Sequence, residues 1–144
     1  MFAPSATLVG STELRDLLAR EPAMADVVRA WSRLTLALVG IGSLAPSPLL
    51  RRSGNAVTAR DQRQLKELGA VGDVCARYFD ADPVDAPFND RLIGIDLDRL
   101  RAVERRIGVA GGTDKSAAIR GAARGRWINI LITDVEVARD LLDD

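Results

Sequence analysis

Short apolar runs alternate with helical stretches through the last third of the chain, and no other feature of the sequence constrains the fold as strongly. Three runs have the length and composition of strands: RLIGI at 91–95, RIGVA at 106–110 and WINILI at 127–132. Helical spacing follows each of them, in DLDRLRAV at 96–103, TDKSAAIRGAAR at 113–124 and DVEVARDLL at 134–142. Strands and helices in this alternation form parallel βαβ units with right-handed crossovers, so the sequence predicts an α/β fold.

Two earlier segments fit the same architecture. The run LTLALVG at 34–40 is apolar on both faces, which is typical of a strand covered above and below. The segment VGDVCARYF at 71–79 alternates in part and carries β-branched and aromatic residues, which predicts one further strand. We therefore expect a mostly parallel sheet with helices on both faces.

Capping residues mark the ends of several predicted helices. Thr58 and Gly69 frame the helical stretch ARDQRQLKEL as its N-cap and C-cap. The spacing from Thr133 to Glu136 is that of a capping box at the start of the final helix. Two more helices are expected near the N-terminus, over 13–20 and 22–33.

The composition excludes several classes of function. Lysine plus arginine and aspartate plus glutamate number 20 each, so the chain lacks the positive charge of a nucleic-acid binder. With no histidine and one cysteine, His-based catalysis, an internal disulfide and a thiolate metal cluster are excluded. No apolar run approaches the roughly 20 residues of a membrane span, and the N-terminus lacks a signal-peptide pattern. We expect one cytoplasmic domain over residues 1–144, with no metal and no cofactor.

The glycine–lysine turn, GVAGGTDKS at 108–116, is the strongest candidate for a binding site. Ligands of parallel α/β sheets bind outside the carboxyl ends of the strands, where this turn is expected. Gly111 and Gly112 allow a ligand to approach closely, and the main-chain amides of residues 111–113, where the following helix begins, are expected to be free to form an anion site. Lys115, one of two lysines in the chain, opposes the helix dipole unless an anion is bound there. A tight turn with a solvated lysine explains the motif equally well.

Asp73 and the glycines of LVGIGSL are further candidates for ligand binding. A carboxylate at Asp73, between apolar residues, is costly to bury without a partner, so we expect it to face a cavity or an amide cluster. A turn aspartate bonded to local backbone is the alternative. Gly40 and Gly42 follow a buried strand at the ligand edge, with Ser43 as a possible donor, and a glycine turn without a ligand is the alternative.

Other conspicuous residues are assigned to structure. Cys75 is expected to be a small buried apolar residue, since no base is present to activate its thiol. Arg51 and Arg52 are expected to be solvated in a loop, with an anion contact as the alternative. Trp31 and Trp127 are expected to pack in the core or at an interface.

Five ordered blocks resemble a known family: LVGIGSL, LGAVGDVCARYFD, NDRLIGIDLDRL, GVAGGTDKSAAIRGAARG and INILITDVEVARDLL. Together they are similar to the C-terminal effector domain of the SorC-type bacterial sugar-binding transcriptional regulators. The resemblance runs from about Phe2 to Leu142, which is most of the chain.

This resemblance implies a Rossmann-like fold related to ribose-5-phosphate isomerases and glucosamine-6-phosphate deaminases. It implies that a phosphorylated sugar binds and switches an attached helix-turn-helix domain on or off DNA. Lys115 matches the family lysine that contacts the ligand phosphate, and Asp73 matches an acidic position that binds sugar hydroxyls. The family's helix-turn-helix and the first part of its effector domain are absent from this chain, so it is expected to be a partial domain: a fragment of a longer protein or the product of a truncated gene.

The function expected from the sequence is therefore sugar-phosphate sensing without turnover, with no direct contact to nucleic acid or membrane. One alternative is a sugar-phosphate isomerase or deaminase with Asp73 as base and Lys115 as electrostatic stabiliser. Another is a half-domain that binds no ligand and associates with itself. A half sheet exposes an edge and an apolar face, so we also expect a homo-oligomer.

Overall fold

The computed structural model describes residues 3, 7–45, 57–84, 86 and 89–143. Its centre is a parallel sheet of three strands in the order β1-β5-β6, built from β1 (Leu36–Gly40), β5 (Arg105–Val109) and β6 (Ile130–Ile132). The predicted α/β class and the parallel sheet are confirmed. The strand expected over 127–132 is shorter: the amide of Trp127 donates to the carbonyl of Ala122, and pairing with β5 begins at Ile130.

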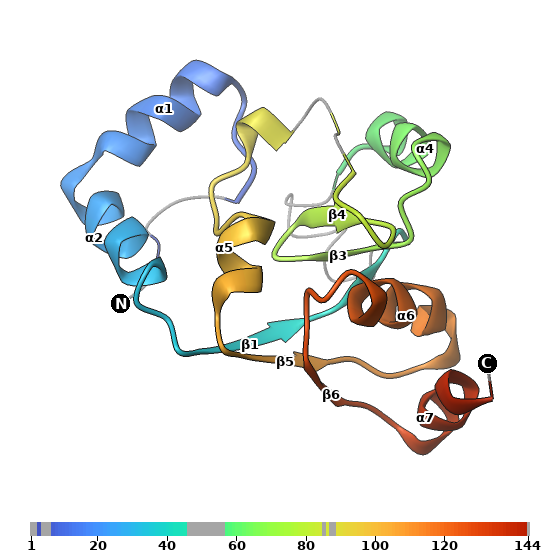
Figure 1. Cartoon of the computed structure of the whole chain (residues 1–144). Helices are drawn as coiled ribbons and strands as arrows, with labels where there is room; N and C mark the ends of the chain where they lie inside the picture. The colour runs from blue at the N-terminus through green and yellow to red at the C-terminus, as the bar shows by residue number, and fades with distance from the viewer. Residues whose placement is uncertain (1–2, 4–6, 46–56, 85, 87–88, 144) are drawn as a thin grey trace.

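The helices α5 (Leu97–Ala102) and α6 (Ser116–Arg124) lie on one side of this sheet, together with the β3–β4 hairpin (Figure 1). Helix α6 connects β5 to β6, and α7 (Val135–Leu142) follows β6. Residues of these elements form one apolar core with the inward side chains of the strands, Ala37, Val39 and Leu131. The helices that bound this core therefore all cover the same face of the sheet.

The opposite face of the sheet, which we call the outer face, is exposed in the described part of the chain. Cross-strand partners form two rows on it, Leu38–Ile107–Ile130 and Gly40–Val109–Ile132, with Leu36 beside Arg105 at one end. Leu38 is 66% exposed and Ile132 55%. The prediction that β1 is covered above and below, with helices on both faces, is wrong for this surface. The outward side chains of β1 are apolar, but no element among the residues that the structure describes packs over them.

A small antiparallel sheet joins β2 (Gly42–Ser43), β3 (Gly72–Val74) and β4 (Arg77–Phe79). The single strand predicted over 71–79 is wrong, because the chain reverses at Cys75 and Ala76. Both residues have positive φ, 54° and 63°, the left-handed conformation that a tight hairpin turn requires. Neither Cys75 nor Ala76 is a glycine or an asparagine, the residue types from which such a turn is predicted in a sequence.

The remaining helices are α1 (Thr12–Arg20), α2 (Pro22–Trp31) and α4 (Ala59–Glu67). Thr58 caps α4 in a capping box with Asp61, and Gly69 follows the helix with φ of 83°, as expected. The strand predicted over 91–95 is wrong. After a 3-10 turn at Asn89–Arg91 this segment is largely buried, and among the described residues its one bridge joins Leu92 to Leu8.

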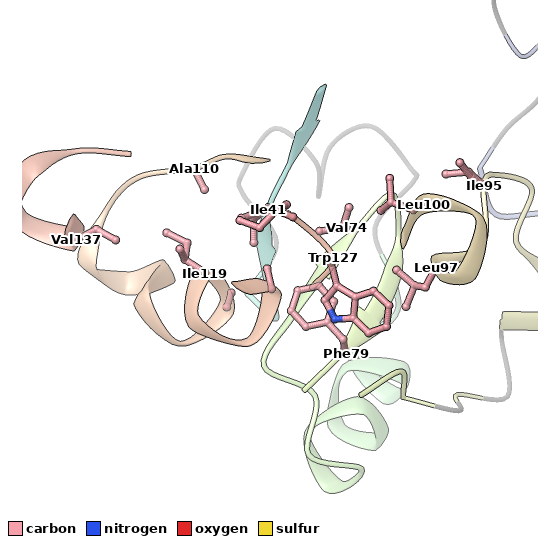
Figure 2. Packing of buried hydrophobic residues seen from close by; sticks show 13 residues of the cluster. Ile41, Val74, Phe79, Ile95, Leu97, Leu100, Ala110, Ile119, Trp127 and Val137 are labelled. Atoms are coloured by element: carbon pink, nitrogen blue, oxygen red, sulfur yellow. The ribbon is translucent and has the colours of Figure 1, made fainter. Parts of the chain in front are cut away.

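Trp127 and Phe79 form the centre of the main core (Figure 2). Their ring centroids are 6.1 Å apart, and both side chains are fully buried. The guanidinium of Arg101 lies over the Trp127 ring, 4.1 Å from its centroid, and also donates to the carbonyl of Gly125 at 3.0 Å. The core thus fixes the hairpin, α5 and the start of β6 against one another. The expected packing role of Trp127 is confirmed, and Trp31 is half-buried against the same core.

Candidate functional site

The candidate site lies at the carboxyl ends of β1 and β5. These neighbouring parallel strands end at Gly40 and Val109, so the turns that follow them are adjacent. The two turns are joined by a hydrogen bond from the Lys115 Nζ to the carbonyl of Ile41, at 3.4 Å. The side chain of Lys115 is thus directed toward the end of β1, on the edge of the sheet where α/β proteins bind ligands.

Asp73 reaches the same place from the small antiparallel sheet. Strand β3 pairs with β2 so that Asp73 lies opposite Gly42. The Asp73 carboxylate occupies the space that a Cβ on Gly42 would fill. Gly42 is therefore required by the position of this carboxylate, which is a more specific role than that of a flexible turn residue.

The Asp73 carboxylate is held in the half-buried site by few polar contacts. Its Oδ2 accepts a hydrogen bond from the Ala76 amide at 3.1 Å, across the hairpin turn. Burial raises the pKa of the Asp73 carboxyl, and the Ala76 hydrogen bond and the charge of Lys115 offset only part of that rise. The alternative interpretation of Asp73, a turn aspartate bonded to local backbone, is confirmed by the Ala76 hydrogen bond, and its role in ligand binding stays a prediction.

The glycine–lysine turn differs from its prediction. The helix expected over 113–124 divides into a 3-10 turn at Thr113–Lys115 and α6, so Lys115 precedes the first turn of the α-helix. The amide of Gly112, expected to be free for an anion, donates to Asp134 Oδ2 at 2.7 Å. That expectation is wrong because a carboxylate of the chain itself occupies the position. Gly111 lies beside the same carboxylate, and a Cβ on it would approach Asp134 Oδ2 to 2.7 Å.

Asp134 is the residue of this region that the sequence analysis missed. Its Oδ1 accepts hydrogen bonds from the amides of Glu136 and Val137, so Asp134 is the N-cap of α7, where a capping box from Thr133 was expected. The hydrogen bond from the Val137 amide, followed in effect by those from Gly112 and Glu136, lowers the pKa of the Asp134 carboxyl. The available signal was its position: Asp134 follows the third parallel strand, on the same edge as the other two turns.

Three amides of the turn remain available to a ligand. Those of Gly111, Thr113 and Asp114 have no hydrogen-bond acceptor among the residues that the structure describes, and all three residues are exposed. Gly40 is also exposed, and a Cβ on it would meet no other atom within 4 Å. The structure therefore brings Gly42, Asp73 and Lys115 together, and places Gly40, Gly111 and Gly112 around them as turn residues.

Other predicted residues are placed as follows. Cys75 is exposed at the tip of the hairpin, so its expected burial is wrong. The hydroxyl of Ser43 donates to the Ala45 carbonyl at 3.2 Å. Arg51 and Arg52 lie outside the described residues. Within the described ranges, no group of three or more potential ligands is placed to hold a metal ion, and no helix has the length and apolarity of a membrane span.

The raised pKa of Asp73 predicts how stability depends on pH. Because the folded protein binds this proton more tightly than the unfolded chain, the carboxyl contributes stability at low pH that is lost as the pH rises through the folded-state pKa. We expect Asp73→Asn to be more stable than the native chain at pH 7, with the difference shrinking toward about pH 4. Thermal unfolding over this range measures it, with the exposed Asp143→Asn as a control for net charge. A variant that is less stable at pH 7 would contradict the assignment.

Comparison with known proteins identifies the class. The family described as a sugar-binding domain matches residues 1–143. The deoxyribonucleoside regulator of Bacillus subtilis (strain 168) is 32% identical over 145 residues, covering 99% of this chain and 46% of that regulator. The crystal structure of the full-length sorbitol operon regulator SorC from Klebsiella pneumoniae has a TM-score of 0.85 at 28% identity, covering 94% of this chain and 44% of that one.

A solved sugar-binding domain of a transcriptional repressor from Vibrio fischeri has a TM-score of 0.86 at 25% identity, covering 98% of this chain and 57% of that one. The fold and these matches define a sugar-binding domain of the type found in bacterial transcriptional regulators. The chain belongs to the family of SorC-type sugar-binding domains. It spans about half the length of the curated relatives that it matches.

Proposed function

We propose that the chain is the effector-sensing part of a cytoplasmic transcriptional regulator and binds a phosphorylated sugar without turning it over. The observation that carries this proposal is the meeting of Lys115, Asp73 and the glycine–lysine turn at the carboxyl ends of β1 and β5. DNA contact is assigned to a part of the regulator outside these residues, because the neutral charge of the chain does not favour nucleic acid.

The site offers polar groups for both the phosphate and the sugar hydroxyls of such a ligand. The ammonium of Lys115 and the amides of Gly111, Thr113 and Asp114 are donors for phosphate oxygens. The Asp73 carboxylate is an acceptor for sugar hydroxyls, and its partial desolvation strengthens such hydrogen bonds. A ligand hydroxyl would add a second hydrogen bond to the one that the Ala76 amide donates to this carboxylate.

An enzymatic alternative has one observation in its favour, since a carboxyl with a raised pKa is suited to act as a general base. Sensing is favoured because the family matches are to regulators, and fold alone does not assign an activity. Incubation with ribose 5-phosphate and with glucosamine 6-phosphate, followed by an assay for the isomerised or deaminated product, distinguishes the two functions. We expect no product.

Binding is tested by thermal shift with ribose 5-phosphate, glucosamine 6-phosphate and further pentose and hexose phosphates. A ligand that binds only the folded state stabilises it by about 2.7 kcal/mol at 100 times its dissociation constant. We expect at least one sugar phosphate to give such a shift, and the unphosphorylated sugars and inorganic phosphate to give much less.

Lys115→Ala is expected to lose most of the response, because it removes the ammonium from the site. The matched control is Lys66→Ala, which removes the other lysine of the chain from an exposed position on α4 and should leave the shift unchanged. A folded native sample that responds to no phosphorylated sugar, or equal responses from the two variants, would contradict the proposal. We further propose that the isolated chain forms a homo-oligomer through its outer face, and light scattering of the purified chain measures its mass.

A further inference from the structure

The anion site predicted at the glycine–lysine turn contains a carboxylate of the chain itself. The Gly112 amide donates to Asp134 Oδ2 at 2.7 Å. The same oxygen lies close to Gly111, since a Cβ on that residue would approach it to 2.7 Å. The double glycine therefore makes room for Asp134, an internal anion, at the turn where a ligand phosphate is proposed to bind.

The main-chain donors proposed for the phosphate are the immediate neighbours of this contact. Three amides of the turn have no acceptor among the described residues, those of Gly111, Thr113 and Asp114. They precede and follow the amide of Gly112 in the chain. A phosphoryl group held by these amides would therefore lie beside the Asp134 carboxylate, and two negative charges at such close range repel each other.

Asp134 is well suited to compete with a dissolved anion for the turn. It follows β6, which pairs in parallel with β5, so the fold holds its carboxylate at a high effective concentration beside the end of β5. The hydrogen bond from the Val137 amide, and next that from Gly112, lower the pKa of the Asp134 carboxyl. The carboxylate therefore keeps its negative charge at neutral pH.

The contact between Gly112 and Asp134 can be exchanged for one with a ligand. Both residues are exposed, and a hydrogen bond at the surface replaces bonds to water and so contributes little net stability. The cap of α7 does not depend on this contact, because Asp134 Oδ1 accepts the amides of Glu136 and Val137. Asp134 can therefore release the Gly112 amide while α7 stays capped.

We propose that Asp134 is an internal competitor that sets the affinity of the glycine–lysine turn for phosphate. Without a ligand, its Oδ2 fills the Gly112 amide and its charge repels an incoming phosphoryl group. When a sugar phosphate binds, a phosphate oxygen replaces Asp134 Oδ2 on that amide. This inference rests on the proposed function, and it adds a residue that opposes binding to those that support it.

A competitor of this kind determines which phosphates the site accepts. It weakens the binding of every phosphate that uses the turn. Inorganic phosphate has no sugar hydroxyl to bond to Asp73, so it is excluded at concentrations at which a sugar phosphate, held by both groups, still binds. Asp134 thereby acts as a specificity-determining residue against free phosphate.

Two substitutions remove the competitor and keep the helix cap. Asp134→Ser and Asp134→Asn both place a favoured N-cap residue before α7, so both variants should fold, which circular dichroism verifies. Both lack the negative charge, and in Asp134→Ser the single hydroxyl caps α7 and leaves the Gly112 amide without its acceptor. The matched control is Glu136→Gln, which removes a charge from the first turn of α7 and leaves the Asp134 carboxylate in place.

Inorganic phosphate is the probe, and its dissociation constant is measured at constant ionic strength by NMR titration of the amides of the turn. We expect Asp134→Ser to bind phosphate about tenfold or more tightly than the native chain, the effect of one close charged contact. Asp134→Asn should gain affinity in the same direction but by less, because its side-chain amide still fills the position. Glu136→Gln should change the constant by about twofold at most.

The same titration of the native chain tests the exchange directly. As phosphate is added at high concentration, the Gly112 amide resonance should shift together with those of Gly111 and Thr113. The reason is that the acceptor of the Gly112 amide changes from a carboxylate to a phosphate oxygen.

Three outcomes would overturn the proposal. The first is that Asp134→Ser binds phosphate no more tightly than Glu136→Gln. The second is that both Asp134 variants fold and bind phosphate more weakly than the native chain, which would make Asp134 a residue that supports the shape of the turn. The third is a native Gly112 resonance that stays unchanged while the neighbouring amides respond to phosphate.

Failure of this proposal is distinguishable from failure of the proposed function. A native chain that responds to no sugar phosphate, combined with a gain of phosphate affinity in Asp134→Ser, would contradict the sensing function and leave the competitor role intact. A native chain that binds a sugar phosphate, combined with equal phosphate affinity in Asp134→Ser and Glu136→Gln, would have the opposite meaning.

Discussion

Trp127→Ala should lower the free energy of unfolding by about 3–5 kcal/mol, the range for loss of a buried tryptophan. The side chain is fully buried at the centre of the main core, beside Phe79. The substitution leaves a cavity and also removes the ring beneath the Arg101 guanidinium, whose centre lies 4.1 Å from the ring centroid. Domains of this size are stable by only about 5–15 kcal/mol, so a large part of the total would be lost.

Urea unfolding measures this effect as a lower midpoint with an unchanged dependence on denaturant. Trp31→Ala is the matched control, because this second tryptophan is half-buried and lies at the end of α2. We expect a smaller loss for it. Equal losses at the two positions would show that the core is not centred on Trp127.

Gly72→Ala is expected to destabilise the fold by about 1–3 kcal/mol, because the site is already closely packed. A Cβ on Gly72 would lie 2.5 Å from the Cβ of Ala118 and 2.7 Å from the carbonyl oxygen of Gly42. One obstacle belongs to α6 and the other to the backbone of β2, so neither can rotate away as a flexible side chain would. The strand β3 must shift, and it carries Asp73 with it.

Thermal unfolding and ligand-induced shift, measured on the same variant, separate these two consequences. Gly10→Ala is the control, since its Cβ would meet no atom within 4 Å. It should be close to neutral in stability and should retain ligand binding. A Gly72→Ala variant as stable as the native chain would mean that β3 and α6 are packed less closely than the structure shows.

Much of the fold could be predicted from local signals. Thr58 and Gly69 marked the two ends of α4, because capping side chains and left-handed glycines act within a few residues of the helix terminus. The apolar run at β5 and the helical spacing at α6 gave one βαβ unit, and the parallel pairing followed from it. Such features depend on neighbours in sequence, so a pattern can show them.

The errors arose where a long-range contact or an unusual backbone conformation decided the structure. The hairpin turn at Cys75 and Ala76 lacks the residue types that favour positive φ, so the sequence predicted one strand where the structure has β3 and β4. The hydrogen bond from Gly112 to Asp134 spans 22 residues and leaves no trace in either local segment. The apolar pattern of β1 indicated side chains suited to burial on both faces of the strand. A sequence pattern does not show, however, which helix or strand packs over each face.

For the candidate site, too, the sequence indicated which residues lie at strand ends but not the contacts between distant strands. Position after a strand end was sufficient to select Lys115 and Gly42, because the carboxyl ends of parallel strands meet at one edge. The detailed role of Gly42 depends on where β3 places the Asp73 carboxylate, and pairing between distant strands sets that position. Asp134 was overlooked because the helix that it caps gave it a sufficient explanation.

The double role of Asp134 has a mechanical consequence. Its Oδ1 accepts hydrogen bonds from the first amides of α7, and its Oδ2 accepts one from the loop that follows β5, the central strand of the sheet. A single side chain thus connects the two segments. If one of them moves by more than the reach of a hydrogen bond, either the other must move with it or a bond to Asp134 must break.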